Sequence, residues 1–209
     1  MVANVITERL ALAGLDPGTV DVAPLAAFLS LMAKWNRHIN LTALPVDPPS
    51  VEAVDRLIVE PVLASRLVEQ PPRAILDIGS GGGSPAIPFR LQFPTASLTM
   101  VESRSKKCAF LREAVRSLEM TGSRVLEARF EDVRDAAGPK ADFVTVRAVR
   151  LDEVAFGVIQ ALAAPDALVL RFTSDHAGPA DETHGLRLLS ERPLLASTRS
   201  SIQLFHVEH

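Results

Sequence analysis

The amino-acid sequence predicts an α/β fold: a doubly wound, mostly parallel sheet with a C-terminal antiparallel hairpin and a small N-terminal helical subdomain. Three observations predict it. Through residues 71–209, short apolar runs alternate with amphipathic helical patterns, as in strand–helix–strand units. A glycine cluster, Gly79 to Gly83, directly follows the first apolar run. Residues 1–70 show helical periodicity instead, so we place a domain boundary near residue 70.

The composition fits a soluble enzyme with one substantial core. The chain has 209 residues, of which 47% are hydrophobic and 22% are charged. Cys108 is the single cysteine, so no intramolecular disulfide can form, and no Cys/His cluster has metal-ligand spacing. No apolar run approaches the ~18 residues of a membrane span. We therefore expect a cytoplasmic protein with no metal site and no membrane contact.

The N-terminal subdomain is predicted from two helical patterns. Apolar side chains recur at three- and four-residue intervals from Leu25 to Trp35, as on one face of an amphipathic helix. Pro24 suits the first turn of that helix. A second helical pattern covers 51–69, and we expect Pro61 to interrupt it.

The elements of the second domain follow one another in regular order. Predicted parallel strands are 74–78, 98–103, 124–130, 141–149 and 167–172, and predicted helices are 86–93, 106–120 and 154–164. The last two strand patterns, 185–195 and 199–208, are joined by a short turn and are therefore predicted to pair antiparallel.

The glycine cluster predicts a cofactor loop at the carboxyl end of the first strand. Glycine reaches positive φ and has no Cβ, so such a turn lets the backbone approach a nucleotide-like ligand closely. A tight turn without a ligand is the alternative. A dinucleotide fingerprint that starts at Gly79 fails at its third glycine, where this chain has Ser84. The looser acid-x-Gly-x-Gly-x-Gly loop of S-adenosylmethionine-dependent methyltransferases fits instead, on Asp77, Gly79, Gly81 and Gly83.

Glu102 points to the same cofactor. It ends the second predicted strand, at about the twenty-residue spacing from the loop at which an acid accepts hydrogen bonds from ribose hydroxyls. An ordinary solvated carboxylate at the end of a strand is the alternative.

The charge distribution leaves nucleic-acid binding open. A net charge of −3 counts mildly against it, because phosphate contacts supply much of the affinity for nucleic acids. Two local basic clusters exist nevertheless: Lys34, Arg37 and His38, and Arg104, Lys106 and Lys107. Each cluster is either a nucleic-acid contact or a solvated face.

Four segments together resemble one family. Residues 34–43 (KWNRHINLTA), 75–88, 101–114 and 141–149 are similar, in this order, to the glucose-inhibited division protein B family, also called ribosomal RNA small subunit methyltransferase G. Lys-Trp-Asn-x-x-x-Asn-Leu-Thr is the most specific element. The resemblance implies a class I (Rossmann-like) S-adenosylmethionine-dependent methyltransferase that methylates N7 of a guanine in the decoding-region loop of 16S ribosomal RNA. The implied partner is 16S ribosomal RNA or the small ribosomal subunit, and we expect a monomer.

The family pattern also implies site residues. Carried over one at a time, its cofactor positions are Gly79, Ser84, Phe130, Glu131 and Arg147. Phe130 is placed to pack beside the adenine ring, and Glu131 either meets the adenine amino edge or simply caps a helix. Arg147 follows a buried-looking run, where an unpaired guanidinium is costly unless it meets a carboxylate or a phosphate. We assign Arg147 a positioning or electrostatic catalytic role, with a structural salt bridge as the alternative.

The implied chemistry explains which residues are missing. N7 of guanine already presents a lone pair, so attack on a sulfonium methyl needs no general base, and catalysis can rest on positioning and electrostatics.

Trp35 either stacks on RNA or completes the apolar stripe, and we favour the core. Asn36, with Asn40 and Thr42, is expected to fix the turn after the helix through side-chain to backbone bonds.

Departures from the family pattern leave several functions open. The chain keeps Arg56 but differs at Leu57, Glu60 and Pro61, at Ala86 in the loop, and at Arg171 and Phe172 at the end of the fifth strand. An active ribosomal RNA guanine-N7 methyltransferase is the leading hypothesis. A methyltransferase acting on another RNA or a small molecule, and a ribosome-associated binding protein with a degenerate site, are the alternatives. An NAD-dependent oxidoreductase is disfavoured by Ser84.

Overall fold

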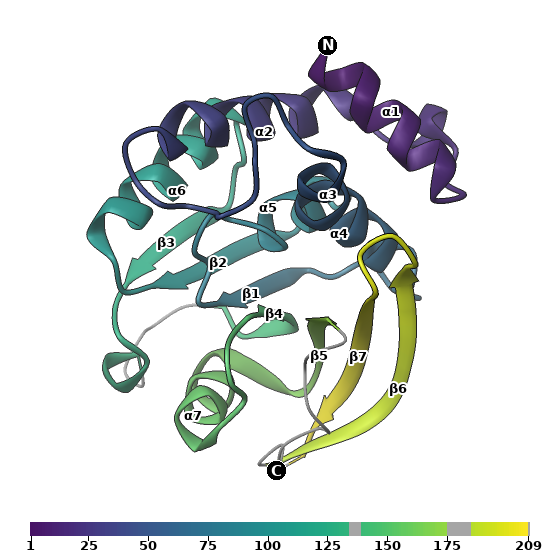
Figure 1. Cartoon of the computed structure of the whole chain (residues 1–209). Helices are drawn as coiled ribbons and strands as arrows, with labels where there is room; N and C mark the ends of the chain where they lie inside the picture. The colour runs from purple at the N-terminus through teal and green to yellow at the C-terminus, as the bar shows by residue number, and fades with distance from the viewer. Residues whose placement is uncertain (134–138, 175–184, 209) are drawn as a thin grey trace.

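A mixed sheet forms the centre of this computed structural model, which describes residues 1–133, 139–174 and 185–208. Within these residues it has seven strands in the order β3-β2-β1-β4-β5-β7-β6 (Figure 1). Five strands are parallel: β1 (Ala74–Ile78), β2 (Ser97–Glu102), β3 (Ser123–Glu127), β4 (Ala141–Arg147) and β5 (Ala163–Ser174). β6 (Leu186–Leu195) and β7 (Ser200–Val207) form the antiparallel hairpin. The predicted α/β fold is thus confirmed, and the strand order reverses between β1 and β4, where doubly wound sheets bind ligands.

The described helices cover the two faces of the sheet unequally. α7 (Glu153–Leu162) packs on one face, against β-strand residues such as Val144, Val169 and Phe205. The opposite face carries α5 (Ala86–Leu91) and α6 (Ser105–Ser117), together with helices from the first part of the chain (Figure 1). These are α1 (Val2–Leu12), α2 (Val22–Asn36), α3 (Val51–Val54) and α4 (Glu60–Ser65), with a 3₁₀ turn, η1, at Pro17–Thr19.

The N-terminal helices and the sheet share one hydrophobic core. Ile6 of α1 and Phe28 of α2 belong to the same buried cluster as Ile75 of β1. Trp35 is half-buried and meets the ring of Phe110 edge to face at 5.9 Å between centroids, so its predicted place in the core is confirmed. The helices before residue 70 therefore pack onto the sheet through one continuous hydrophobic core.

Several predicted element boundaries were wrong, and two of them bear on the site. The third strand ends at Glu127, not at residue 130, and Phe130 begins a 3₁₀ turn, η3 (Phe130–Asp132). The crossover helix ends at Leu162 and β5 begins at once, because Ala163 pairs with Ala141 of β4. Pro165 explains the second difference, since proline disfavours the helical conformation of the residue before it and has no N–H to continue a helix.

The predicted interruption at Pro61 was misplaced by one turn. The helix is interrupted before the proline, by a π-helical turn, η2 (Asp55–Val59). Pro61 lies in the first turn of α4, where its missing N–H and fixed φ are tolerated. None of the helices in the described part of the chain is long and apolar enough to span a membrane.

Candidate active site

A cavity of about 610 Å³ opens at the carboxyl ends of the central strands. Its volume lies within the range of small-molecule sites, and its place is the switch point of the sheet. We call one side the glycine wall, formed by Gly79, Ser80, Gly81, Gly82 and Glu102. We call the other side the arginine wall, formed by Arg56, Glu60, Arg147 and Arg171.

The glycine wall is a backbone cradle that side chains would fill. Gly79 has φ +70°, and a Cβ there would lie 2.5 Å from Cγ2 of Val149. A Cβ on Gly82 would lie 3.1 Å from the carbonyl oxygen of Leu41, which also lines the cavity. Gly83 is different, because its Cβ would meet Ile87 and Leu111 and it is not among the lining residues. Gly79 and Gly82 thus let the loop backbone lie close to Val149 and Leu41, which line the cavity, whereas Gly83 lets the loop pack on α5 and α6.

Glu102 fastens the glycine wall to the end of β2. One carboxylate oxygen accepts from the N–H of Gly81 at 2.9 Å, and the other accepts from the N–H of Arg104 at 2.8 Å. The residue is only 7% exposed, so it is not an ordinary solvated carboxylate. A carboxylate offers about four lone pairs, so two remain for hydroxyl donors in the cavity.

Asp77 lies beneath the loop and does not line the cavity, contrary to a direct cofactor contact. Its Oδ1 accepts from Oγ1 of Thr145 at 2.6 Å, and its Oδ2 is buried without a hydrogen-bond partner among the described residues. Burial raises the pKa of Asp77 to about 6, although the hydrogen bonds and Arg147 favour the charged form.

Arg147 reaches across the cavity from β4 to the N-terminal helices. It donates to Glu60 at 2.7 Å and to the carbonyl oxygen of Arg56, and its guanidinium stacks 4.7 Å from the ring centroid of Phe172. Burial lowers the pKa of Arg147, while Glu60 opposes that shift. The predicted carboxylate partner is therefore Glu60, which is itself 3% exposed.

The π-helical turn supplies acceptors for this site. The N–H of Glu60 bonds to the carbonyl of Asp55, five residues earlier, instead of the Arg56 carbonyl that an α-helix would use. The Arg56 carbonyl accepts from Arg147 instead. Pro61 has no N–H to offer the Leu57 carbonyl, which accepts from Oγ of Ser84 at 2.9 Å. Leu57, Glu60 and Pro61, which depart from the family pattern, thus all take part in the hydrogen bonding around the π-helical turn.

The Lys-Trp-Asn motif shapes a further part of the cavity. Oδ1 of Asn36 accepts from the N–H groups of Leu41 and Thr42 at 2.8 and 3.1 Å, and its Nδ2 donates to the Thr42 carbonyl. The predicted role of Asn36 in fixing the turn is confirmed. Leu41 and Thr42 both line the cavity, so this turn connects the motif to the site.

The remaining predicted residues lie at different distances from the cavity. Ser84 lines it, whereas Phe130 and Glu131 are not among the lining residues. Phe130 is half-buried beside Gly79, with Cζ 3.7 Å from the place of a Cβ there, and Glu131 is exposed. The described residues contain no group of three or more His, Cys, Asp or Glu side chains that could hold a metal ion.

Sequence reasoning did not identify Lys107, Arg56 and Glu60 as lining residues. In the sequence, Lys107 belongs only to a basic cluster, and Arg56 and Glu60 lie in a segment that departs from the family pattern. No local pattern marks them, because their roles arise from elements that meet only in the folded chain.

Comparisons with known proteins identify relatives of this chain. The family model for GidB, rRNA small subunit methyltransferase G, matches residues 21–184. Ribosomal RNA small subunit methyltransferase G of Xanthomonas axonopodis pv. citri is 38% identical over 141 residues, covering 65% of this chain and 62% of the relative. The protein of the same name from Polynucleobacter asymbioticus is 33% identical over 186 residues, covering 87% of this chain and 83% of the relative. The match thus spans about 62% of the length of the first of these relatives.

Solved structures share the fold at low sequence identity. The putative methyltransferase yhhF from Escherichia coli has a TM-score of 0.55 and 18% identity, covering 72% of this chain and 86% of that one. A SAM dependent methyltransferase from Aquifex aeolicus has a TM-score of 0.54 and 13% identity, covering 73% of this chain and 92% of that one. The architecture is that of class I methyltransferases.

Proposed function

This chain belongs to the rRNA small subunit methyltransferase G family, and we propose that it transfers a methyl group from S-adenosylmethionine to N7 of a guanine in 16S ribosomal RNA. The observation that carries the proposal is a single cavity at the switch point of the sheet. There a glycine cradle with a buried carboxylate faces a wall of arginines. The oxidoreductase alternative is disfavoured by Ser84, which stands where the dinucleotide fingerprint requires its third glycine.

The glycine wall fits the methyl donor. Gly79 and Gly82 bring bare backbone to the cavity beside Val149 and Leu41, and the carboxylate of Glu102 has acceptor capacity left for ribose hydroxyls. We assign Gly81 and Ser84 to the same subsite because they line the cavity. Bound there, S-adenosylmethionine supplies a sulfonium methyl group for transfer to an electron pair.

Other predicted cofactor residues have supporting roles in this proposal. Gly83 packs the loop onto the helices, and Asp77 joins β1 to β4 by accepting from Thr145. Phe130 and Glu131 lie in the 3₁₀ turn next to the loop, and we place the adenine on that side of Gly79 because Phe130 already borders it.

The arginine wall fits an anionic substrate. Among the described lining residues, Arg56, Lys107, Arg147 and Arg171 are basic, whereas Glu60 and Glu102 are acidic. The cavity is therefore locally basic on a chain with a net charge of −3, as phosphate binding requires. Arg147 is half-buried, paired with Glu60 and stacked on Phe172, so it presents a fixed positive group without reorganisation.

The residues present suffice for chemistry at N7. That nitrogen carries a lone pair and no proton, so the chain needs no general base, and its contribution is to orient the guanine and exclude water. An amine or hydroxyl acceptor would instead require a group that removes a proton.

The test is methyl transfer to undermethylated ribosomes. The purified protein is incubated with labelled S-adenosylmethionine and with 30S subunits, or naked 16S RNA, from a strain that lacks the native enzyme. Mass mapping then locates the methylated nucleotide. We expect methylation at one guanine of 16S RNA. Methylation of a different RNA would support the divergent methyltransferase, and cofactor binding without transfer would support the binding protein. Failure to bind the cofactor would exclude both enzymes.

A further inference from the structure

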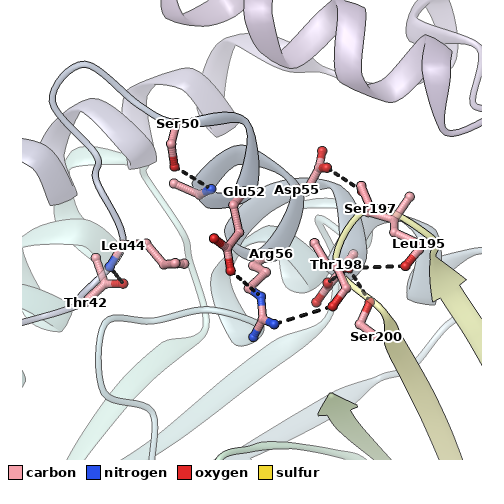
Figure 2. A network of polar contacts seen from close by, with 12 residues as sticks. Thr42, Leu44, Ser50, Glu52, Asp55, Arg56, Leu195, Ser197, Thr198 and Ser200 are labelled. Atoms are coloured by element: carbon pink, nitrogen blue, oxygen red, sulfur yellow. Dashed lines mark hydrogen bonds and ion pairs between the residues drawn. The ribbon is translucent and has the colours of Figure 1, made fainter. Parts of the chain in front are cut away.

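The turn between β6 and β7, residues 196–199, contacts the arginine wall from the far end of the chain. β7 runs antiparallel to β5, so this turn lies at the carboxyl end of β5, beside the cavity. Figure 2 shows the turn facing the helical segment that carries Asp55 and Arg56. The turn lies outside residues 21–184, which the family model matches.

Thr198 completes the hydrogen bonding of Glu60. Its hydroxyl donates to Oε1 of Glu60 at 2.7 Å, while Oε2 of Glu60 accepts from Arg147 at 2.7 Å. Thr198 is 7% exposed, so the contact is desolvated. Its single proton goes to Glu60, so the neighbouring hydroxyl of Ser200, 2.7 Å away, is the donor in their contact. The carboxylate that holds Arg147 is thereby fixed from two directions, by different elements.

The same turn also contacts Arg56. The carbonyl oxygen of Thr198 accepts from Nη2 of Arg56 at 3.5 Å (Figure 2). The residues that follow Thr198 and Arg147 both have left-handed backbone conformations: Arg199 has φ +46°, and Ala148 has φ +56°. Left-handed conformations are uncommon for residues other than glycine, and tertiary contacts must hold them.

We propose that Thr198 is a positioning residue for methyl transfer, which acts on Arg147 through Glu60. The inference rests on the proposed function, because it assigns Arg147 to the reaction. The β6–β7 turn sets where the guanidinium stands in the cavity. Without the Thr198 hydroxyl, Oε1 of Glu60 loses its buried donor, and the carboxylate turns toward another donor and moves Arg147 with it.

Ser197, the preceding residue, provides a matched control. Its hydroxyl donates to Oδ2 of Asp55 at 2.7 Å, and Arg9 also binds Asp55 through two bonds of 2.8 and 2.7 Å. None of these three residues is among those lining the cavity. The turn thus makes two similar hydroxyl–carboxylate contacts with the helices, of which one leads to Arg147 and the other does not.

The experiment compares Thr198→Val, Thr198→Ser and Ser197→Ala in the full chain. We expect Thr198→Val to lower kcat by about tenfold to hundredfold, since small misplacements of catalytic groups cost that much, with the KM for S-adenosylmethionine within about twofold. Thr198→Ser should restore kcat. Ser197→Ala should lower the thermal midpoint while kcat stays at the wild-type value. An unchanged kcat in Thr198→Val, or an equal loss in Ser197→Ala, would overturn the inference.

A crystal structure of Thr198→Val gives a second readout that does not depend on activity. We expect the Arg147 guanidinium to be displaced from its wild-type position. An Arg147 that stays in place overturns the positioning role. An inactive wild-type protein would refute the proposed function instead, so the two failures are distinguishable.

Discussion

The two walls of the cavity are built in different ways. On the glycine wall, the bond that joins loop to carboxylate spans 21 residues, between Gly81 and Glu102 of adjacent strand–loop units. On the arginine wall, Glu60 is bonded to residues 87 and 138 positions away. The glycine wall is therefore encoded locally, in a motif and the next strand end. The arginine wall depends on three elements that meet only when the sheet and its hairpin are complete.

The largest expected effect comes from breaking the arginine wall. Arg147→Ala leaves the Glu60 carboxylate buried without its cation, which costs about 3–5 kcal/mol of stability and removes turnover. Urea unfolding measures the loss. The double variant Arg147→Ala/Glu60→Ala should lose less than the sum of the two single variants, because no unpaired charge remains. Additive losses would show that the two residues are not coupled.

The next largest effect tests the cradle of the glycine wall. Gly79→Ala combines the left-handed strain of about 1–2 kcal/mol with a clash against Val149 worth about 1–3 kcal/mol, and it closes the cofactor subsite. Gly122→Ala is the matched control, because it has φ +72° but its Cβ would approach Ser97 only to 3.7 Å. Calorimetric titration of S-adenosylmethionine should show binding to Gly122→Ala and none to Gly79→Ala. Equal affinities of the two variants for S-adenosylmethionine would contradict the role of Gly79 in cofactor binding.

Asp77→Asn tests whether the buried carboxyl beneath the glycine wall lowers the stability of the fold. The pKa of Asp77 is raised by burial from 3.8 to about 6, so the folded state holds its proton after the unfolded state has lost it. Wild-type stability therefore declines from pH 4 to pH 6 through this group, by about 2–3 kcal/mol. Asp77→Asn should be more stable than wild type by that amount at pH 7, with the gain vanishing near pH 4. A pH-independent difference would contradict the raised pKa.

The smallest expected effect compares the contribution of Glu102 to cofactor binding with that of Glu127, its neighbour in the sheet. Glu102→Gln should weaken S-adenosylmethionine binding about tenfold, which is ~1.4 kcal/mol, through the loss of charged acceptors. Glu127 pairs with Glu102 in the register of β2 and β3 but is bonded to Arg112 outside the cavity. Glu127→Gln should bind the cofactor like wild type. Equal weakening in both variants would point to a general charge effect.

Sequence reasoning succeeded where the determinants are contiguous. The glycine loop, Glu102 and the turn at Asn36 follow from residue types a few positions apart, and their placement was as predicted. The need of Arg147 for a carboxylate was predictable from its buried surroundings, but the identity of Glu60 was not. The π-helical turn before Pro61 and the contact of Thr198 depend on tertiary packing, for which one sequence offers no periodic signal.

A crystal structure with S-adenosylhomocysteine is the most direct test of the proposal that the glycine wall binds the cofactor and the arginine wall faces the substrate. We expect the ligand along the glycine wall, with its ribose hydroxyls bonded to the carboxylate of Glu102. The Arg147–Glu60 pair should remain intact and face the open part of the cavity. A ligand bound outside the cavity, or one whose ribose makes no contact with Glu102, would contradict the account.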